Sequence, residues 1–148
     1  MQYSDLKIAL GQIEIQAGRP DLNAAAMLQM IQQTENADLI VFPELSLSGN
    51  LIGNWVQQKA FIQDCQTWAE KIIAASQKLP LIFGNLDPKT QSSAFYLAAE
   101  GRLWASGLLS SSLNLKKTIS SNYKPNWEKV LLPLPGRTIS LCIFSETA

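Results

Sequence analysis

Residues 37–50 read ADLIVFPELSLSGN, a continuous apolar run followed by a proline, an acid and several turn residues. The run at 39–42 predicts a short buried strand that ends at Pro43. Glu44 follows at once, so it lies beyond the carboxyl end of that strand, where open α/β sheets bind their ligands. A half-buried carboxylate at such a position suits general-base chemistry near neutral pH. The alternative is a structural Glu44 that caps a helix or forms a salt bridge.

The segments on both sides of this stretch predict a sheet covered by helices. Asp21 can cap a first helix, and an apolar stripe at helical spacing predicts a second one that contains Cys65 as a small core residue. Glu100-Gly101 is typical of a hairpin turn. The expected elements are strands at 6–15, 38–42, 79–83, 93–99, 103–109 and 138–144 and helices at about 22–36 and 61–73. This order predicts an α/β fold, a mixed β-sheet with helices on one face.

Composition bounds the class of protein. The chain has 148 residues, 47% of them apolar and 16% charged, which predicts a single domain over 1–148. Twelve basic and twelve acidic residues cancel, so no nucleic-acid or membrane partner is expected. No Gly-rich phosphate loop or metal-ligand spacing is present, and we expect no cofactor. Cys65 and Cys142 lie far apart, which fits a reducing compartment, and the absence of an export signal then predicts a cytoplasmic location.

The chain contains no histidine. Ser-His-Asp and Cys-His catalysis and zinc sites that contain histidine all need an imidazole, so these classes are excluded. Any hydrolytic chemistry must therefore use carboxylates, lysines, cysteine or serine.

The stretch FPELSLSGN at 42–50 resembles the segment that carries the catalytic glutamate in the nitrilase, or carbon-nitrogen hydrolase, superfamily. LKIALGQIEIQAG at 6–18, Asn23 and ADLIVFPE at 37–44 are similar to the opening of that family. The likeness covers about the first 85 residues, and the loop after Gly49 most resembles the glutaminase domain of glutamine-dependent NAD synthetases. It implies the N-terminal half of an αββα sandwich and a small amide substrate such as glutamine.

The resemblance also implies a lysine and a cysteine beside the glutamate. NLKKTISSNYKPNWEK at 114–129 is similar to the lysine segment of the family, and Lys117 fits its spacing best. The ammonium group of Lys117 would orient the substrate and stabilise an oxyanion. The alternative is a solvated loop lysine, because Lys116 lies beside it and Ser120-Ser121 replaces the Leu-Pro of the family.

The nucleophile segment departs from the family pattern. Aligning Ile139-Ser140 and Glu146 with the family places Phe144 at the nucleophile position and Cys142 two residues earlier. Strand side chains alternate, so Cys142 and Phe144 share a face, and a register shift of two residues would present Cys142. Ser145 would face the other side. The alternative for Cys142 is a core residue of an apolar strand.

The printed sequence stops at Ala148, where the resembling family would continue with the second half of its sandwich. We therefore expect that a partner chain or a second copy in a homo-oligomer covers the sheet, or that the chain is a truncated relic. The first hypothesis for function is an amidase or glutaminase with Glu44, Lys117 and Cys142 as catalytic residues. The second is a non-catalytic module for oligomerisation or ligand binding, in which Phe144 fills the nucleophile pocket. The third, an unrelated α/β binder of small molecules, leaves the 42–50 stretch unexplained.

Overall fold

A computed structural model describes residues 5–108, 130–134 and 137–141, with the side chains described for 5–108. The chain divides into two compact units, 1–108 and 109–148. The described part of the second unit is an antiparallel pair, β6 (Val130–Leu134) and β7 (Arg137–Leu141). We did not predict β6, and β7 matches the start of the strand expected at 138–144. The single-domain organisation over 1–148 stays a prediction.

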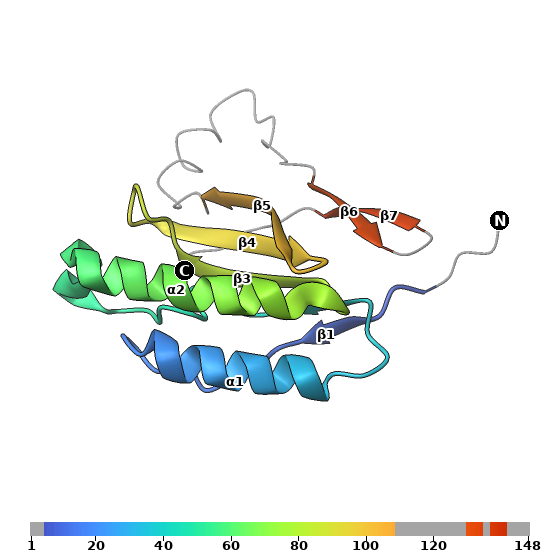
Figure 1. Cartoon of the computed structure of the whole chain (residues 1–148), viewed down its shortest axis with the longest axis horizontal. Helices are drawn as coiled ribbons and strands as arrows, with labels where there is room; N and C mark the ends of the chain where they lie inside the picture. Colours follow the sequence, from blue (N-terminus) through green and yellow to red (C-terminus); the bar gives the residue numbers. More distant parts are fainter. Residues whose placement is uncertain (1–4, 109–129, 135–136, 142–148) are drawn as a thin grey trace, which may run out of the picture. The chain divides into compact units, whose positions relative to one another are not determined.

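The first unit is built on one five-stranded sheet, most of whose strands are labelled in Figure 1. Its strands are β1 (Ile8–Leu10), β2 (Leu39–Val41), β3 (Leu81–Leu86), β4 (Ser93–Ala99) and β5 (Arg102–Leu108). They lie in chain order; the first three are parallel to one another, and β4 is antiparallel to both neighbours. The predicted mixed sheet is confirmed.

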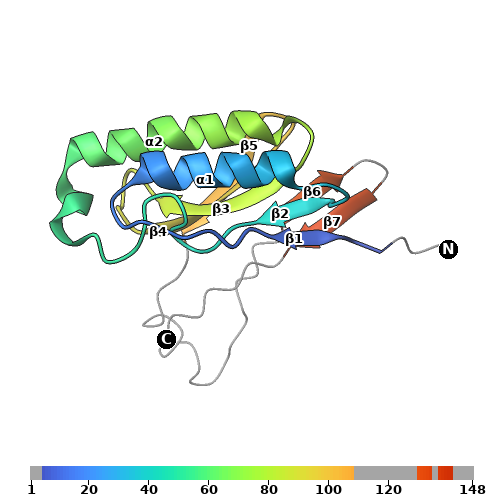
Figure 2. The same cartoon turned by 90° about the horizontal axis from the view of Figure 1, so that it is seen from below.

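Two helices, α1 (Pro20–Gln33) and α2 (Lys59–Ala74), cover one face of the sheet, as Figure 2 shows. The cause is the strand order. The connection from β1 to β2 and the connection from β2 to β3 both step in the same direction across the sheet. Right-handed crossover connections that do so place their helices on the same face. Two short 3₁₀ helices, η1 (Gly53–Gln57) and η2 (Ala75–Gln77), precede and follow α2. In the part of the chain that the structure describes, no helix has the length and apolar character needed to cross a membrane.

The start of α1 differs from the expectation. Arg19 occupies the N-cap position and Pro20 the first turn, so Asp21 lies inside the helix rather than capping it. Proline is favoured there because the first turn needs no backbone N–H donor. The Asp21 carboxylate instead accepts a hydrogen bond from the Arg19 guanidinium at 2.7 Å, and this contact lowers the pKa of Asp21.

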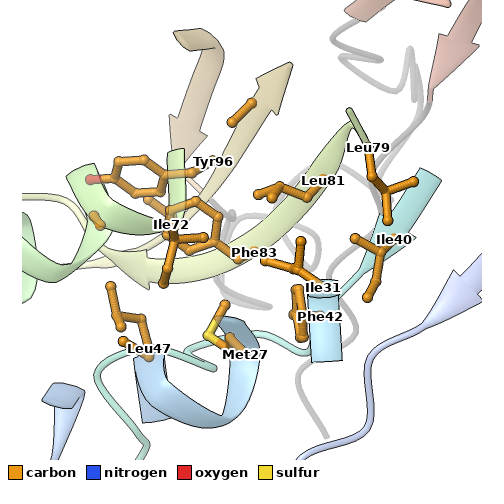
Figure 3. Packing of buried hydrophobic residues seen from close by; sticks show 14 residues of the cluster. Met27, Ile31, Ile40, Phe42, Leu47, Ile72, Leu79, Leu81, Phe83 and Tyr96 are labelled. Atoms are coloured by element: carbon orange, nitrogen blue, oxygen red, sulfur yellow. The ribbon is translucent and has the colours of Figure 1, made fainter. Parts of the chain in front are cut away.

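The main core lies between the helices and the sheet. Figure 3 shows Met27 and Ile31 of α1 and Ile72 of α2 packed towards the sheet side chains. Phe83 and Tyr96 stack with their ring centroids 5.2 Å apart. Cys65 is fully buried in a smaller cluster with Phe61, Ile62 and Leu86, so its predicted role as a core residue is confirmed.

The predicted hairpin between β4 and β5 is also confirmed. Glu100 and Gly101 have φ of 54° and 73°, the left-handed values that a two-residue hairpin turn of type I′ requires. The first strand is shorter than predicted, because only Ile8–Leu10 pairs with the three residues of β2. Beyond it, one more hydrogen bond joins Gly11 N to Val41 O at 2.7 Å, and then the chain leaves the sheet.

Candidate active site

The candidate site is built on the turn after β2, which we call the Glu44 turn and define as residues 43–49. The chain leaves the β2 ladder after Phe42, whose N–H donates to Ile82 O at 2.8 Å. It returns at Leu47, whose N–H donates to Gly84 O at 3.0 Å. Both ends of the turn are therefore fixed to β3, and Glu44 lies at the carboxyl edge of the parallel strands, as predicted.

Gly84 lets the turn approach β3 closely. A Cβ atom added at Gly84 would overlap the Leu45 nitrogen and would lie 2.7 Å from the Glu44 carbonyl carbon. Leu45 itself has φ of 51°, a left-handed value that is uncommon for a residue with a side chain. The Ser46 hydroxyl accepts a hydrogen bond from Gly84 N at 3.2 Å. Close packing and hydrogen bonds thus hold the backbone of Glu44 in one conformation.

A second support comes from the segment that follows β1. Gly18 N–H donates to Ser48 O at 3.0 Å. Gly49 has φ of 80°, and a Cβ atom added there would lie 2.6 Å from the Cα atom of Ala17. Because the segment and the turn touch backbone to backbone, neither can move far without the other.

The Glu44 side chain is exposed, so the expectation that it is half buried is wrong for the part of the protein that the structure describes. The reason is that residues 5–108 pack against the backbone side of the turn and leave the carboxylate facing away. Within those residues, Glu44 caps no helix and takes no part in the ion pairs that join Arg19 to Asp21 and Arg102 to Glu100. The structural alternative for Glu44 therefore finds no support in residues 5–108.

The other predicted site residues, Lys117 and Cys142, lie outside the described residues, as do Phe144 and Ser145. The structure therefore does not test whether Lys117 or Cys142 lies near Glu44, and their roles stay predictions. In the described ranges, no group of three His, Cys, Asp or Glu side chains is arranged to hold a metal ion.

The residues that support the turn, above all Gly84 and Ser46, were not predicted from the sequence. One signal for Gly84 was available. An isolated glycine inside an apolar strand indicates a place where another backbone approaches closely, and LIFGNL at 81–86 contains one. No comparable signal marks Ser46, because serine is common in any turn.

Known proteins resemble this chain in sequence and in fold. No family model matches it. The glutamine-dependent NAD(+) synthetase of Xylella fastidiosa strain Temecula1 is 31% identical over 97 residues, which are 64% of this chain and 17% of that protein. The synthetase of that name from Xanthomonas campestris is 28% identical over 107 residues, 68% of this chain and 19% of the relative.

Solved structures agree in fold. The glutamine-dependent NAD+ synthetase of Acinetobacter baumannii superposes with a TM-score of 0.68 and 18% identity, over 91% of this chain and 27% of that one. A Nesterenkonia amidase of the nitrilase superfamily superposes with a TM-score of 0.64 and 20% identity, over 93% of this chain and 55% of the amidase. This chain has part of a nitrilase, or carbon-nitrogen hydrolase, fold.

The chain spans less than a fifth of the length of the curated relatives that it matches. A variant of the Nesterenkonia amidase has been seen with the acetamide moiety of fluoroacetamide added covalently at its active-site cysteine. That chemistry belongs to the amidase.

Proposed function

We propose that this protein is a carbon-nitrogen hydrolase of the amidase or glutaminase type, in which Glu44 is the general base. The observation that carries the proposal is the Glu44 turn. It holds an exposed carboxylate at the carboxyl edge of a nitrilase-type sheet by backbone contacts, and within residues 5–108 the carboxylate has no structural role that would explain it. A base held in a fixed position, whose carboxylate is not engaged elsewhere, is what general-base catalysis requires.

In the proposed reaction, Glu44 takes the proton of the Cys142 thiol as the sulfur attacks the amide carbonyl. The Lys117 ammonium stabilises the oxyanion of the tetrahedral intermediate. Glu44 then returns the proton to the departing nitrogen, ammonia leaves, and a thioester remains on Cys142. Glu44 next deprotonates a water that attacks the thioester, and the free acid and the thiol are released.

The proposed substrate is glutamine, which would yield glutamate and ammonia. The names of the relatives from Xylella and Xanthomonas support this choice, because both are synthetases that depend on glutamine. In this proposal the ammonia passes to a synthetase partner, and a second copy or a partner chain covers the sheet. We place the reaction in the cytoplasm, which agrees with the reduced state that a Cys142 thiol needs.

A comparison of two substitutions tests the role of Glu44. Glu44→Gln removes the base and keeps the shape, so we expect ammonia release from glutamine to fall by about 10²- to 10⁴-fold. Glu35→Gln is the matched control, because Glu35 is an exposed acid between α1 and β2, at the opposite end of β2. It should keep the wild-type rate. Equal rates for Glu44→Gln and the wild-type protein would contradict the assignment.

The second candidate is a non-catalytic nitrilase-like module, and one observation favours it: Phe144 stands at the aligned nucleophile position. The two candidates differ in the effect of Cys142→Ala. A catalytic Cys142 predicts complete loss of ammonia release, whereas the module predicts no release from the wild-type protein under any condition. Wild-type turnover that survives Cys142→Ala would rule out Cys142 as the nucleophile.

A further inference from the structure

Asn23, a buried polar residue in the first part of α1, is only 1% exposed and makes three side-chain hydrogen bonds to backbone groups. Its Oδ1 atom accepts from Gln16 N at 2.7 Å, and its Nδ2 atom donates to Gln16 O at 2.8 Å. The same Nδ2 atom donates to Leu47 O at 2.9 Å. Asn23 therefore connects three separate parts of the chain: α1, the segment after β1 and the Glu44 turn.

These three bonds use both ends of the amide group. Two of them run in opposite directions to the backbone N–H and C=O groups of one residue, Gln16, which fixes the orientation of the Asn23 side chain. The remaining Nδ2 proton is then directed at Leu47 O, in the turn that carries Glu44. Because Asn23 and Leu47 are both buried, loss of the Asn23 donor would leave the Leu47 carbonyl without a partner, which is costly. The turn is thus held from the α1 side by Asn23 and from the sheet side by Gly84.

We propose that Asn23 is a positioning residue that fixes the Glu44 carboxylate by holding the backbone of the Glu44 turn. The inference rests on the proposed function, since it assigns to Asn23 a role in the amide hydrolysis that Glu44 performs. Asn23 touches no substrate. Without its donor, the turn keeps its bonds to β3 but loosens on the α1 side. A displacement of about 1 Å at a catalytic group lowers turnover by about 10²-fold.

Two substitutions and one matched control test this role. Asn23→Ala removes all three bonds. Asn23→Asp keeps the bond accepted from Gln16 N but loses both donors, and it places a carboxylate beside two carbonyl oxygens. Ser76→Ala is the control: Ser76 is also fully buried, and its hydroxyl also joins two backbone groups, Ile73 O and Gly101 N, away from the Glu44 turn.

The first readout is amide hydrogen exchange of the full chain, which reports the turn whether or not the protein is active. In Asn23→Ala, we expect the N–H groups of Gly18 and Gly49 to exchange at least about 10-fold faster, while that of Leu47, which donates to β3, and those of β4 keep their wild-type rates. In Ser76→Ala, acceleration should be confined to Gly101 and its neighbours. In Asn23→Asp, protection should recover as the pH falls, because the protonated acid regains one donor. Acceleration spread evenly over the first unit, or none in the turn, would overturn the positioning role.

The second readout is ammonia release from glutamine. Both Asn23 variants should lower kcat by about 10- to 100-fold and leave KM within about threefold of the wild-type value, because the base is displaced and the binding groups are not. Ser76→Ala should keep the wild-type kcat. If the wild-type protein releases no ammonia, the proposed function fails and the catalytic part of this inference fails with it. Rapid exchange in the turn combined with an unchanged kcat would overturn the positioning role of Asn23 but not the proposed function.

Discussion

Glu44 and Gly84 depend on each other, although 40 positions separate them in the sequence. The turn that presents the carboxylate can lie against β3 only because Gly84 has no side chain. A methyl group there meets backbone atoms on both sides of the Glu44–Leu45 peptide, and backbone atoms fixed by hydrogen bonds cannot rotate away as the end of a side chain can.

Gly84→Ala is accordingly expected to lower the free energy of unfolding by about 1–3 kcal/mol, the range for overpacking, and to reduce ammonia release as well. Gly53→Ala is the control. Gly53 has a positive φ of 55°, but an added Cβ atom would meet nothing within 4 Å, so its cost is the backbone strain of about 1 kcal/mol alone. Urea unfolding measures the free energy of unfolding of both variants, and the ammonia assay measures their activity. A fully active Gly84→Ala protein would contradict the role of this close approach.

At the scale of single residues, the position of Glu44 could be predicted because it follows from one local pattern, an apolar run stopped by a proline. Its exposure could not. Burial depends on which parts of the chain pack over a side chain, and that is a property of the whole fold rather than of 37–50. The contacts of Asn23 could not be predicted for the same reason. Two of its three hydrogen bonds are to Gln16 and the third is to Leu47, and only the whole fold brings these residues together.

Among the elements, α2 shows how a predicted stripe of apolar residues forms the buried face of a helix. The expected apolar stripe is confirmed, and within it the neighbours Ile72 and Ile73 differ in depth. Ile72 is fully buried in the main core, whereas Ile73 is only partly buried at its margin. The two positions have the same residue type and nearly the same backbone, so they form a natural matched pair.

For this pair we expect Ile72→Ala to lower the free energy of unfolding by about 2–5 kcal/mol, through lost burial and the cavity left between α1, α2 and Phe83. Ile73→Ala should cost no more than about half as much, because solvent already reaches its side chain. Thermal or urea unfolding of both variants measures the difference. Equal losses would show that the helix packs on a different face.

The strand at 6–15 is the element in which prediction and structure differ most. The alternation of residues 10–15 is real, but it does not come from a sheet: Ile13 packs against the main core from a segment without regular structure. A longer β1 would need a longer partner, and β2 has three residues because the chain turns at Glu44. The pattern therefore marked the partial burial of Ile13, but Leu10 is 71% exposed, and the pattern could not record the missing partner strand.

For the whole molecule, the fold class followed from the order of the elements. Parallel strands need crossover helices, and sequential strand order leaves those helices on one face. The proposed catalytic set could not be tested in this way, because Lys117 and Cys142 lie outside the described residues. The central claim, which we propose, is that Glu44 and Cys142 both take part in amide hydrolysis.

The most direct test of that claim is the alkylation of the native protein by fluoroacetamide at pH 8, followed by mass spectrometry. We predict that the Cys142 sulfur displaces fluoride and gains the acetamide moiety, and that Glu44→Gln slows this reaction at least about 10-fold. Cys65 serves as the internal control, because burial raises the pKa of its thiol to about 12 and keeps it neutral and inaccessible. If Cys142, like Cys65, reacts only after unfolding, or if its rate is independent of Glu44, the enzymatic account is contradicted and only the nitrilase fold remains.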